Sequence, residues 1–147
     1  METYQVVLLI AAPAAGLVCM VFWLRGRYGR IRAELDLEIR QSGEGILVFP
    51  EAGSFRGARS RYGRLKCDGV IAATDRRIVF RKLIGAGLEV LLADVVGLRE
   101  DKWFLQSYRS GRRHLILQTR DGNEIGFLVR DNERWKRALG FVAPRAE

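Results

Sequence analysis

Arginine side chains separated by glycine and serine follow one another between residues 54 and 66, in the segment SFRGARSRYGRLK. Guanidinium groups bind phosphate and carboxylate oxygens through paired N–H donors, and glycines let backbone N–H groups approach the same anion. The segment therefore predicts a loop that binds an anionic ligand, together with the start of a following strand. Its candidate ligand-binding residues are Arg56, Arg59, Arg61, Arg64 and Lys66.

The excess of positive charge extends beyond this segment. Between residues 54 and 82 the chain carries nine cationic side chains against two carboxylates, and the whole chain has a net charge of +8. Such an excess is typical of proteins that meet an anionic partner, either through a specific pocket or through a solvated basic face without one. Arg76 and Arg77 are predicted to hold a hairpin, paired with Asp75 or Asp94.

Residues suited to catalysis or metal binding are few and scattered. The single histidine, His114, has no Cys or His near it in the sequence, and Cys19 and Cys67 form no CxxC pair. The adjacent carboxylates Glu100 and Asp101 have no nucleophile beside them. The chain also lacks the fingerprints of hydrolases, zinc proteases and nucleotide-binding enzymes. We therefore predict no catalytic residue, no metal site and no cofactor, and a structural role for His114.

A second group combines aromatic and basic side chains, and two interpretations of it stay open. The group forms an exposed aromatic–basic surface, or Trp103 and Phe104 belong to a strand or the core and the rest to a hairpin loop, which the pattern favours. The apolar, glycine-rich residues 83–88 are predicted to form a plain hairpin loop. The members of the aromatic–basic group are Trp103, Phe104, Tyr108, Arg109, Arg112 and Arg113.

The elements that position these groups begin with an uncharged N-terminal stretch. Residues 6–24 are VVLLIAAPAAGLVCMVFWL, which as a helix spans roughly 28 Å, close to the hydrocarbon thickness of a bilayer. A cleaved signal peptide would need a basic start, but the charged side chain before the stretch is Glu2. The sequence thus predicts an uncleaved transmembrane anchor over residues 1–24, with Ala11, Ala12, Ala15 and Gly16 available to pack on another helix.

Four arginines follow this stretch and predict its orientation. By the positive-inside rule, they place the chain after Leu24 in the cytoplasm and the N-terminus outside. The expected location is a plasma or inner membrane, crossed once, and Cys67 is expected to stay reduced. These topology determinants are Arg25, Arg27, Arg30 and Arg32.

Residues 25–44 form a charged connector for which a strand and a helix are both considered. Residues 33–40 alternate as a strand would, but Ile31, Leu35 and Ile39 recur at the spacing of a helix face, and the composition favours helix. Beyond the connector, seven short strands are predicted, and the clearest hairpin turns at Asp121-Gly122. The predicted strands span residues 46–49, 65–73, 77–83, 88–92, 95–99, 114–119 and 124–129.

A helix is predicted to close the chain. Asp131 is its expected N-cap, and Trp135, Ala138, Leu139 and Val142 fall on one face. Trp135 is expected to plug the core. An antiparallel sheet that rolls up leaves an open end, which a helix with one apolar face can cover.

The segment GVIAATDRRIVF, residues 69–80, resembles the core signature of the GRAM and bacterial PH-like domains, and residues 91–98 are similar to the segment that follows it there. The resemblance covers roughly residues 43 to 141. It implies a PH-like split barrel of about seven strands with a C-terminal capping helix, used for binding rather than catalysis. The expected organisation is an anchor (1–24), a connector (25–44), a PH/GRAM-like domain (45–142) and a tail (143–147).

These observations lead to two hypotheses of function. The first is a membrane-anchored, cytoplasmic binding module whose basic face contacts anionic phospholipid or a membrane-associated protein partner. The alternative is a structural or accessory subunit of a membrane protein complex, without lipid specificity. Nucleic acid is disfavoured as a partner because the chain has no recognition motif for it. Fold resemblance alone does not decide between the two hypotheses.

Overall fold

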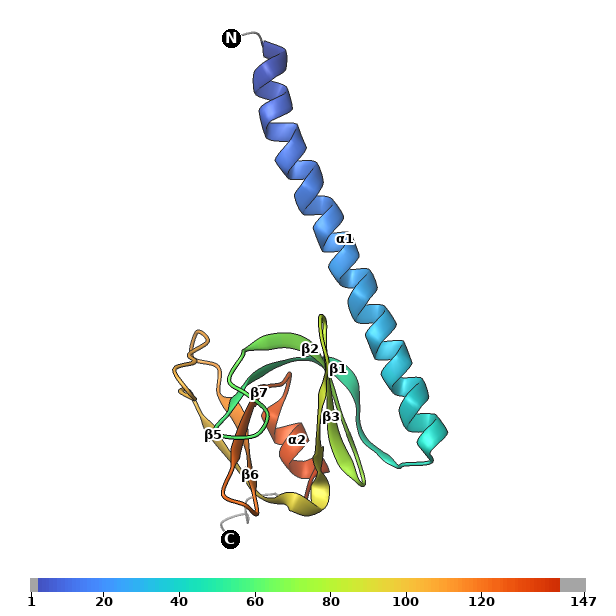
Figure 1. The fold of residues 1–147 in the computed structure, drawn as a ribbon, viewed down its shortest axis with the longest axis vertical. Helices are drawn as coiled ribbons and strands as arrows, with labels where there is room; N and C mark the ends of the chain where they lie inside the picture. The colour runs from blue at the N-terminus through green and yellow to red at the C-terminus, as the bar shows by residue number, and fades with distance from the viewer. Residues whose placement is uncertain (1–2, 141–147) are drawn as a thin grey trace.

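The computed structural model describes residues 3–140, without the side chains at positions 3, 6, 8 and 10. Glu2, Val142 and the tail 143–147, which the sequence analysis uses, lie outside the described residues. A long N-terminal helix precedes a seven-stranded antiparallel sheet, and a short helix closes the described part (Figure 1). The elements are α1 (Thr3–Ser42), β1 (Ile46–Ala58), β2 (Cys67–Thr74), β3 (Arg77–Lys82), β4 (Leu88–Leu91), η1 (Leu92–Asp94), β5 (Val95–Asp101), β6 (His114–Thr119), β7 (Glu124–Leu128) and α2 (Asn132–Ala138).

The seven predicted strands are present, but β1 is much longer than predicted. It continues through residues 50–58 because inward-facing side chains such as Glu51 and Phe55 keep the strand on the sheet. Residues 54–58 of the arginine-rich segment therefore belong to a strand, and the prediction that they form a loop is wrong. The loop itself runs from residue 59 to residue 66.

The sheet is open, so the predicted split barrel is wrong. The strand order is β4-β3-β2-β1-β7-β6-β5, which leaves β4 and β5 as edges. Register shifts along the 13 residues of β1 bend it, so that it pairs with β2 and, near its end, with β7. The sheet curls around α2 without closing (Figure 1). Trp135 of α2 is 1% exposed and fills the space between the two halves of the sheet.

One face of the sheet, here called the α2 face, carries the main core. The rings of Phe55, Phe80 and Phe127 lie with centroids 5.7–6.1 Å apart, in tilted pairs. Asp131 caps α2 as predicted, by accepting a hydrogen bond from the Arg134 N–H. The Trp135 indole N–H donates to Glu51 at 2.9 Å, so the buried tryptophan is also satisfied as a hydrogen-bond donor.

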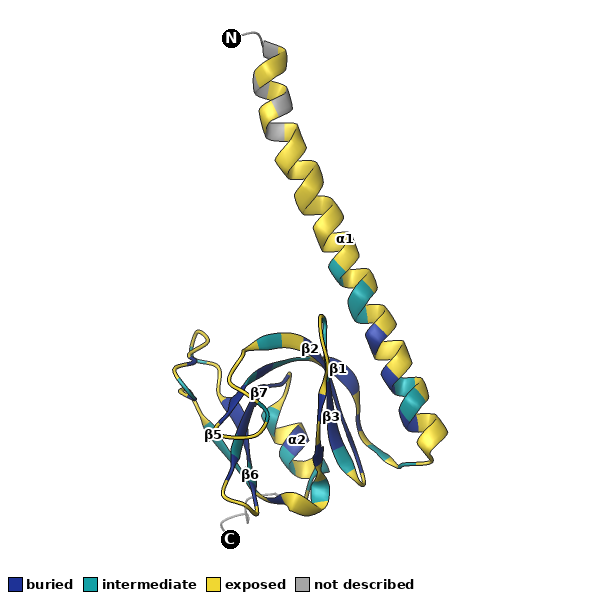
Figure 2. Cartoon of the chain, in the orientation of Figure 1, coloured by how far each residue is buried: buried dark blue, intermediate teal, exposed yellow. Residues whose placement is uncertain are grey.

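The opposite face, the α1 face, is covered by the C-terminal half of α1. The helix interpretation of the connector is confirmed, since α1 runs without a break to Ser42. Ile31, Leu35 and Ile39, spaced one turn apart, are buried against the strands below. Figure 2 shows this buried stripe beside the exposed N-terminal half. The strand residues under the stripe are Val70, Ala72 and Val79.

Arg77 ties this half of α1 to the sheet. Its guanidinium contacts the carboxylates of Glu38 in α1 at 3.2 Å, Glu44 at 3.1 Å and Glu89 in β4 at 2.7 Å. The predicted pairing with Asp75 or Asp94 is therefore wrong for Arg77. Asp75 instead accepts a hydrogen bond from the Gly45 N–H. Because the Arg77 side chain is only 15% exposed, these pairs are less screened by water than surface ion pairs.

The transmembrane anchor predicted for residues 1–24 is not supported. Within the described part of the chain, no helix is both long enough and apolar enough to cross a bilayer. Residues 11–16 of the stretch are all alanine, proline or glycine, which contribute little to its apolar character. The single-pass topology, the N-outside orientation, the plasma or inner membrane location and the membrane as partner were deduced from this span, and they lose their basis with it.

Candidate functional site

The structure divides the five candidate ligand-binding residues into separate groups. Arg59 pairs with Glu124 at 2.5 Å, and Arg61 pairs with Asp121 at 3.4 Å, so two of the arginines bind the β6–β7 hairpin. Arg99, and after it Arg59, hold the pKa of Glu124 at about 2. The charges of Arg59 and Arg61 thus serve to fix the β1–β2 loop. Asn123, 3% exposed, strengthens the attachment by bonding to both backbone groups of Ser60.

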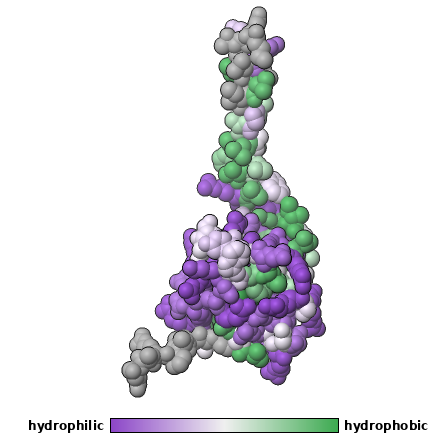
Figure 3. All heavy atoms as spheres, turned by 90° about the vertical axis from the view of Figure 1, so that its left-hand side faces the viewer, coloured by the Kyte–Doolittle hydropathy of each residue, from purple (hydrophilic) through white to green (hydrophobic). Residues whose placement is uncertain are grey.

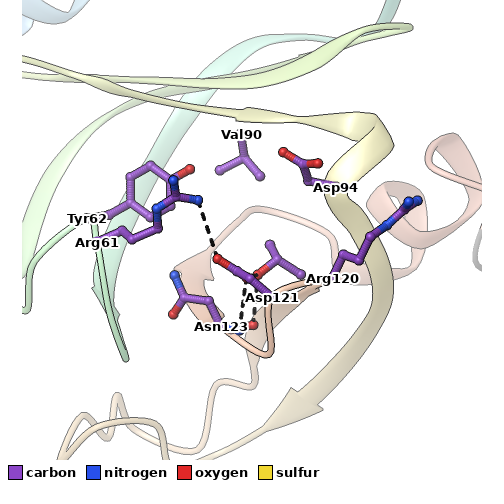
Figure 4. A pocket seen from close by; sticks show the side chains of 8 residues that line it. Arg61, Tyr62, Val90, Asp94, Arg120, Asp121 and Asn123 are labelled. Carbon is purple, nitrogen blue, oxygen red and sulfur yellow. Dashed lines mark hydrogen bonds and ion pairs between the residues drawn. The ribbon is translucent and has the colours of Figure 1, made fainter.

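A pocket of about 260 Å³ lies between the β1–β2 loop, β4 and the β6–β7 turn. In Figure 4, Arg61 and Asp121 point toward one another across it. Arg120 and Asp94 add one charge of each sign to its lining. An anion entering here would have to displace Asp121 from Arg61, so the pocket is a poor candidate for the anionic ligand that the sequence predicts.

Arg56 lies in β1 on the α1 face of the sheet, next to the inward-facing Phe55. Its Nε donates to the Ser107 hydroxyl at 2.8 Å, and that hydroxyl lies 3.0 Å from His114 Nε2. The other ring nitrogen, Nδ1, lies 3.1 Å from the Asp101 carbonyl oxygen, which can only accept. The proton is therefore assigned to Nδ1, and the Ser107 hydroxyl donates to Nε2. The network joins β1, β6 and the loop between β5 and β6.

This serine–histidine pair is not accessible for catalysis. Ser107 is 1% exposed and His114 is 0% exposed. Burial lowers the pKa of His114, so the ring is neutral and acts as a hydrogen-bonding partner inside the domain. A nucleophile needs contact with its substrate. The arrangement therefore agrees with the structural role predicted for His114.

The loop of residues 102–113 folds over the α1 face, beside Arg56. Phe104 lies against Gly126 of β7, where an added Cβ would come within 2.3 Å of its ring. Leu105 lies against Gly57 of β1, the residue that faces Gly126 across the strand pair. The glycine pair thus leaves room for the loop. The loop turns tightly at Leu105 and Gln106, which both have positive φ.

The loop presents two aromatic rings to solvent. Trp103 and Tyr108 stack with centroids 4.7 Å apart, and they are 61% and 48% exposed. Phe104 is only 3% exposed, so it is a core residue, as the favoured interpretation predicted. Trp103 lies on the surface, as the other interpretation predicted. Tyr108 is followed by the exposed Arg109, so aromatic and cationic groups meet here.

Cationic side chains from three segments gather at this position. Burial, and after it the charge of Arg109, lowers the pKa of Arg56. The charges of Arg56 and Lys66 in turn contribute to the lowered pKa of His114 after burial. Asp68 acts on the pKa of Arg56 in the opposite direction, so it offsets part of this positive charge. Lys66 and Arg109 have no ion pair among the described residues. We call Arg56, Lys66, Trp103, Tyr108 and Arg109 the arginine–aromatic surface.

The remaining predicted residues lie apart from this surface. Arg64 is exposed in the β1–β2 loop. Arg27 donates to the Leu83 carbonyl at 2.8 Å, and Arg25 and Arg32 line hollows between α1 and β1, while Arg30 is exposed. The role of these four as topology determinants depends on the span and is not retained.

Metal and thiol chemistry have little support in the described residues. No three His, Cys, Asp or Glu side chains among them are grouped as metal ligands would be. Cys19 and Cys67 are free, and burial raises the pKa of Cys67, which makes its thiol a weaker nucleophile at neutral pH.

Sequence reasoning missed the part played by Ser107 and ranked Trp103 wrongly. Ser107 carries no sequence signal, because its contacts with Arg56 and His114 come from segments 51 and 7 residues away. For Trp103 a signal existed, since it follows three charged residues, Glu100, Asp101 and Lys102, where a strand ends. The chain matches no protein-family model, and no curated protein is similar enough to it to match.

Proposed function

We propose that the protein is a non-catalytic binding module that holds an acidic segment of a partner protein on the arginine–aromatic surface. The observation that carries this proposal is the gathering of Arg56, Lys66 and Arg109 beside two exposed, stacked rings. Exposed aromatic rings and arginines are enriched at the energetic centres of protein interfaces. The cations supply complementarity to carboxylates, and the rings supply apolar area.

Part of the surface is held in place by contacts within the domain, which favours binding over non-specific attraction. Arg56 is held by Ser107, and Ser107 is held by His114. The Trp103–Tyr108 stack sits on a loop whose Phe104 is buried against β7. A ligand that meets preformed groups loses less conformational entropy on binding than one that must order them.

The resemblance of residues 69–80 to the GRAM and bacterial PH-like signature supports the same proposal at the level of the fold. The resemblance implies binding of ligands or proteins rather than catalysis, although the open sheet departs from the split barrel that it also implies. The resemblance rests on those short motifs, and it does not choose the ligand. The choice of an acidic protein segment rests on the surface itself.

A titration with a short glutamate-rich peptide tests the proposal. Lys66→Gln/Arg109→Gln removes two cations that carry no structural contact among the described residues, and we expect its affinity to fall about tenfold, since close charge pairs contribute roughly 0.5–1 kcal/mol each. The control Arg30→Gln/Arg76→Gln removes the same net charge from exposed positions elsewhere. If both double variants lose the same affinity, the peptide responds only to net charge, and the proposed site is refuted.

A second candidate function follows from the N-terminal half of α1. This half projects beyond the sheet and carries many exposed apolar side chains, among them Leu9 at 71% and Phe22 at 70% (Figures 2 and 3). Exposed apolar patches of this extent mark interaction sites. We propose, as the alternative, an accessory subunit that docks this helix on a helix of a partner protein through its small residues.

Site-specific photo-crosslinking tests this alternative function. A photoreactive residue at Ala15, on the small-residue face, is expected to give one defined cross-linked product in cells. The same residue at Arg76, at the far end of the sheet, serves as the control. If position 15 gives no product, or the same products as position 76, the helix-docking function is wrong.

A further inference from the structure

Three hollows adjoin one another along the line where α1 passes over β1. Their volumes are about 280, 340 and 220 Å³. Arg32 lines all three, and Phe49 and Pro50 line two of them. Because they share lining residues, we treat them together as one groove, here called the α1–β1 groove. It begins beside Tyr28 of α1 and ends beside Arg134 of α2.

The rim of the groove is cationic. Arg25 and Arg32 stand on α1, and Arg130 follows β7 on the other side. All three are exposed, and the described residues offer none of them an ion pair. The carboxylates of the lining are already neutralised, since Glu51 is bound by Arg134 and Asp36 by Arg40. The groove therefore holds uncompensated positive charge.

The floor of the groove is apolar. It is made by Pro50 and Ala52 of β1, Val70 of β2 and the rings of Tyr28 and Phe49. Phe49 is 54% exposed, although it stands in a strand whose neighbours Val48 and Pro50 are buried. An exposed ring between cations provides an anchor point for an apolar side chain of a ligand.

From this arrangement we infer that the α1–β1 groove binds an extended, acidic segment of a partner protein, with carboxylates on the arginine rim and apolar side chains on the floor. An extended chain places successive side chains on opposite sides, which suits a groove with a charged rim and an apolar floor. Charge complementarity excludes a basic segment. The groove shares no residue with the arginine–aromatic surface, so the inference does not depend on the proposed function.

The inference is tested on the full chain with a peptide that alternates glutamate and leucine. We expect Arg32→Gln/Arg130→Gln to weaken its binding about tenfold. Arg30→Gln/Arg76→Gln is the matched control, because Arg30 lies two residues from Arg32 on a different side of the same helix. This control is expected to bind as the unchanged protein does.

Three outcomes would refute the inference that the groove binds this peptide. The first is that both double variants lose affinity equally, and the second is that a peptide with serine in place of leucine binds as tightly. The third is that Lys66→Gln/Arg109→Gln abolishes binding of the alternating peptide, since the ligand would then occupy the arginine–aromatic surface. Conversely, if that last variant has no effect on either peptide, the proposed function fails while the groove stands.

Discussion

Individual side chains in this protein take their roles from partners far away in the sequence. Arg59 and Arg61 look equivalent to Arg56 in the sequence, yet they bind the hairpin carboxylates while Arg56 binds a serine hydroxyl. Arg76 and Arg77 are adjacent, but Arg77 holds three carboxylates and Arg76 is exposed. The cationic character of the site could be predicted from the sequence. Which cation stays available could not, because that depends on long-range ion pairs.

Replacement of Arg77 tests the carboxylate cluster. Arg77→Gln leaves Glu38, Glu44 and Glu89 without their shared cation, and we expect the free energy of unfolding to fall by about 2–3 kcal/mol. Arg76→Gln changes the same charge at the neighbouring position and is expected to stay within about 0.5 kcal/mol. Urea unfolding measures both. Similar values for the two variants would contradict the role of Arg77 as a tie between α1 and the sheet.

The acid dependence of stability tests the Glu124 cluster. The folded-state pKa of Glu124, about 2, lies below its ordinary value of 4.5, so its ionised form stabilises the fold above pH 4.5. This contribution is lost as the pH falls from 4.5 toward 2, and we expect it to be about 2 kcal/mol. Glu124→Gln should remove it. The difference in unfolding free energy between the protein and Glu124→Gln is therefore expected to shrink as the pH falls from 4.5 toward 2. A constant difference would contradict the stabilising role of the ionised Glu124.

The helices and strands could be predicted from the sequence better than the roles of single side chains. Strand alternation, the Asp121-Gly122 turn and the Asp131 cap each depend on neighbours along the chain, and each was correctly placed. The length of β1 was missed because the segment that begins at Ser54 is rich in arginine and glycine, which favours a loop locally. Its first residues, 54–58, are held in the sheet by pairing with β2 and β7. The transmembrane span was predicted from one apolar stretch, although α1, which contains this stretch, continues into a charged half that packs on the sheet.

The packing of α1 can be measured directly. Leu35→Ala opens a cavity under the helix at a position that is 1% exposed, and a loss of about 2–4 kcal/mol in unfolding free energy is expected. Leu37, 55% exposed on the same turn of helix, is the matched control, and Leu37→Ala should cost less than about 0.5 kcal/mol. A small loss at position 35 would mean that α1 is not docked.

The glycine pair under the 102–113 loop gives a prediction that joins an element to the site. Gly126→Ala places a Cβ within 2.3 Å of the Phe104 ring, so the loop must move and the Trp103–Tyr108 stack with it. Trp103 fluorescence is expected to change, and affinity for the glutamate-rich peptide is expected to fall. Gly26→Ala meets no atom within 4 Å in the α1 helix and should stabilise by about 0.5–1 kcal/mol. If Gly126→Ala binds the peptide as tightly as the unchanged protein, the 102–113 loop does not contribute to the binding site.

The whole molecule combines a sheet domain with the three separate contact surfaces that we propose. The arginine–aromatic surface and the α1–β1 groove lie on the sheet domain, and the apolar half of α1 extends beyond that domain (Figure 3). Each surface has its own tryptophan close to it. Trp103 belongs to the arginine–aromatic surface, Trp135 donates to Glu51 in the lining of the groove, and Trp23 is exposed on the projecting half of α1.

Indole N–H signals in a two-dimensional NMR spectrum therefore report on each surface separately, because the chain contains three tryptophans. On addition of the glutamate-rich peptide, the Trp103 signal is predicted to move to saturation while the Trp23 signal stays fixed. The movement should disappear in Lys66→Gln/Arg109→Gln and persist in Arg30→Gln/Arg76→Gln. A Trp103 signal that stays in place while the peptide is bound would contradict the arginine–aromatic surface as the binding site.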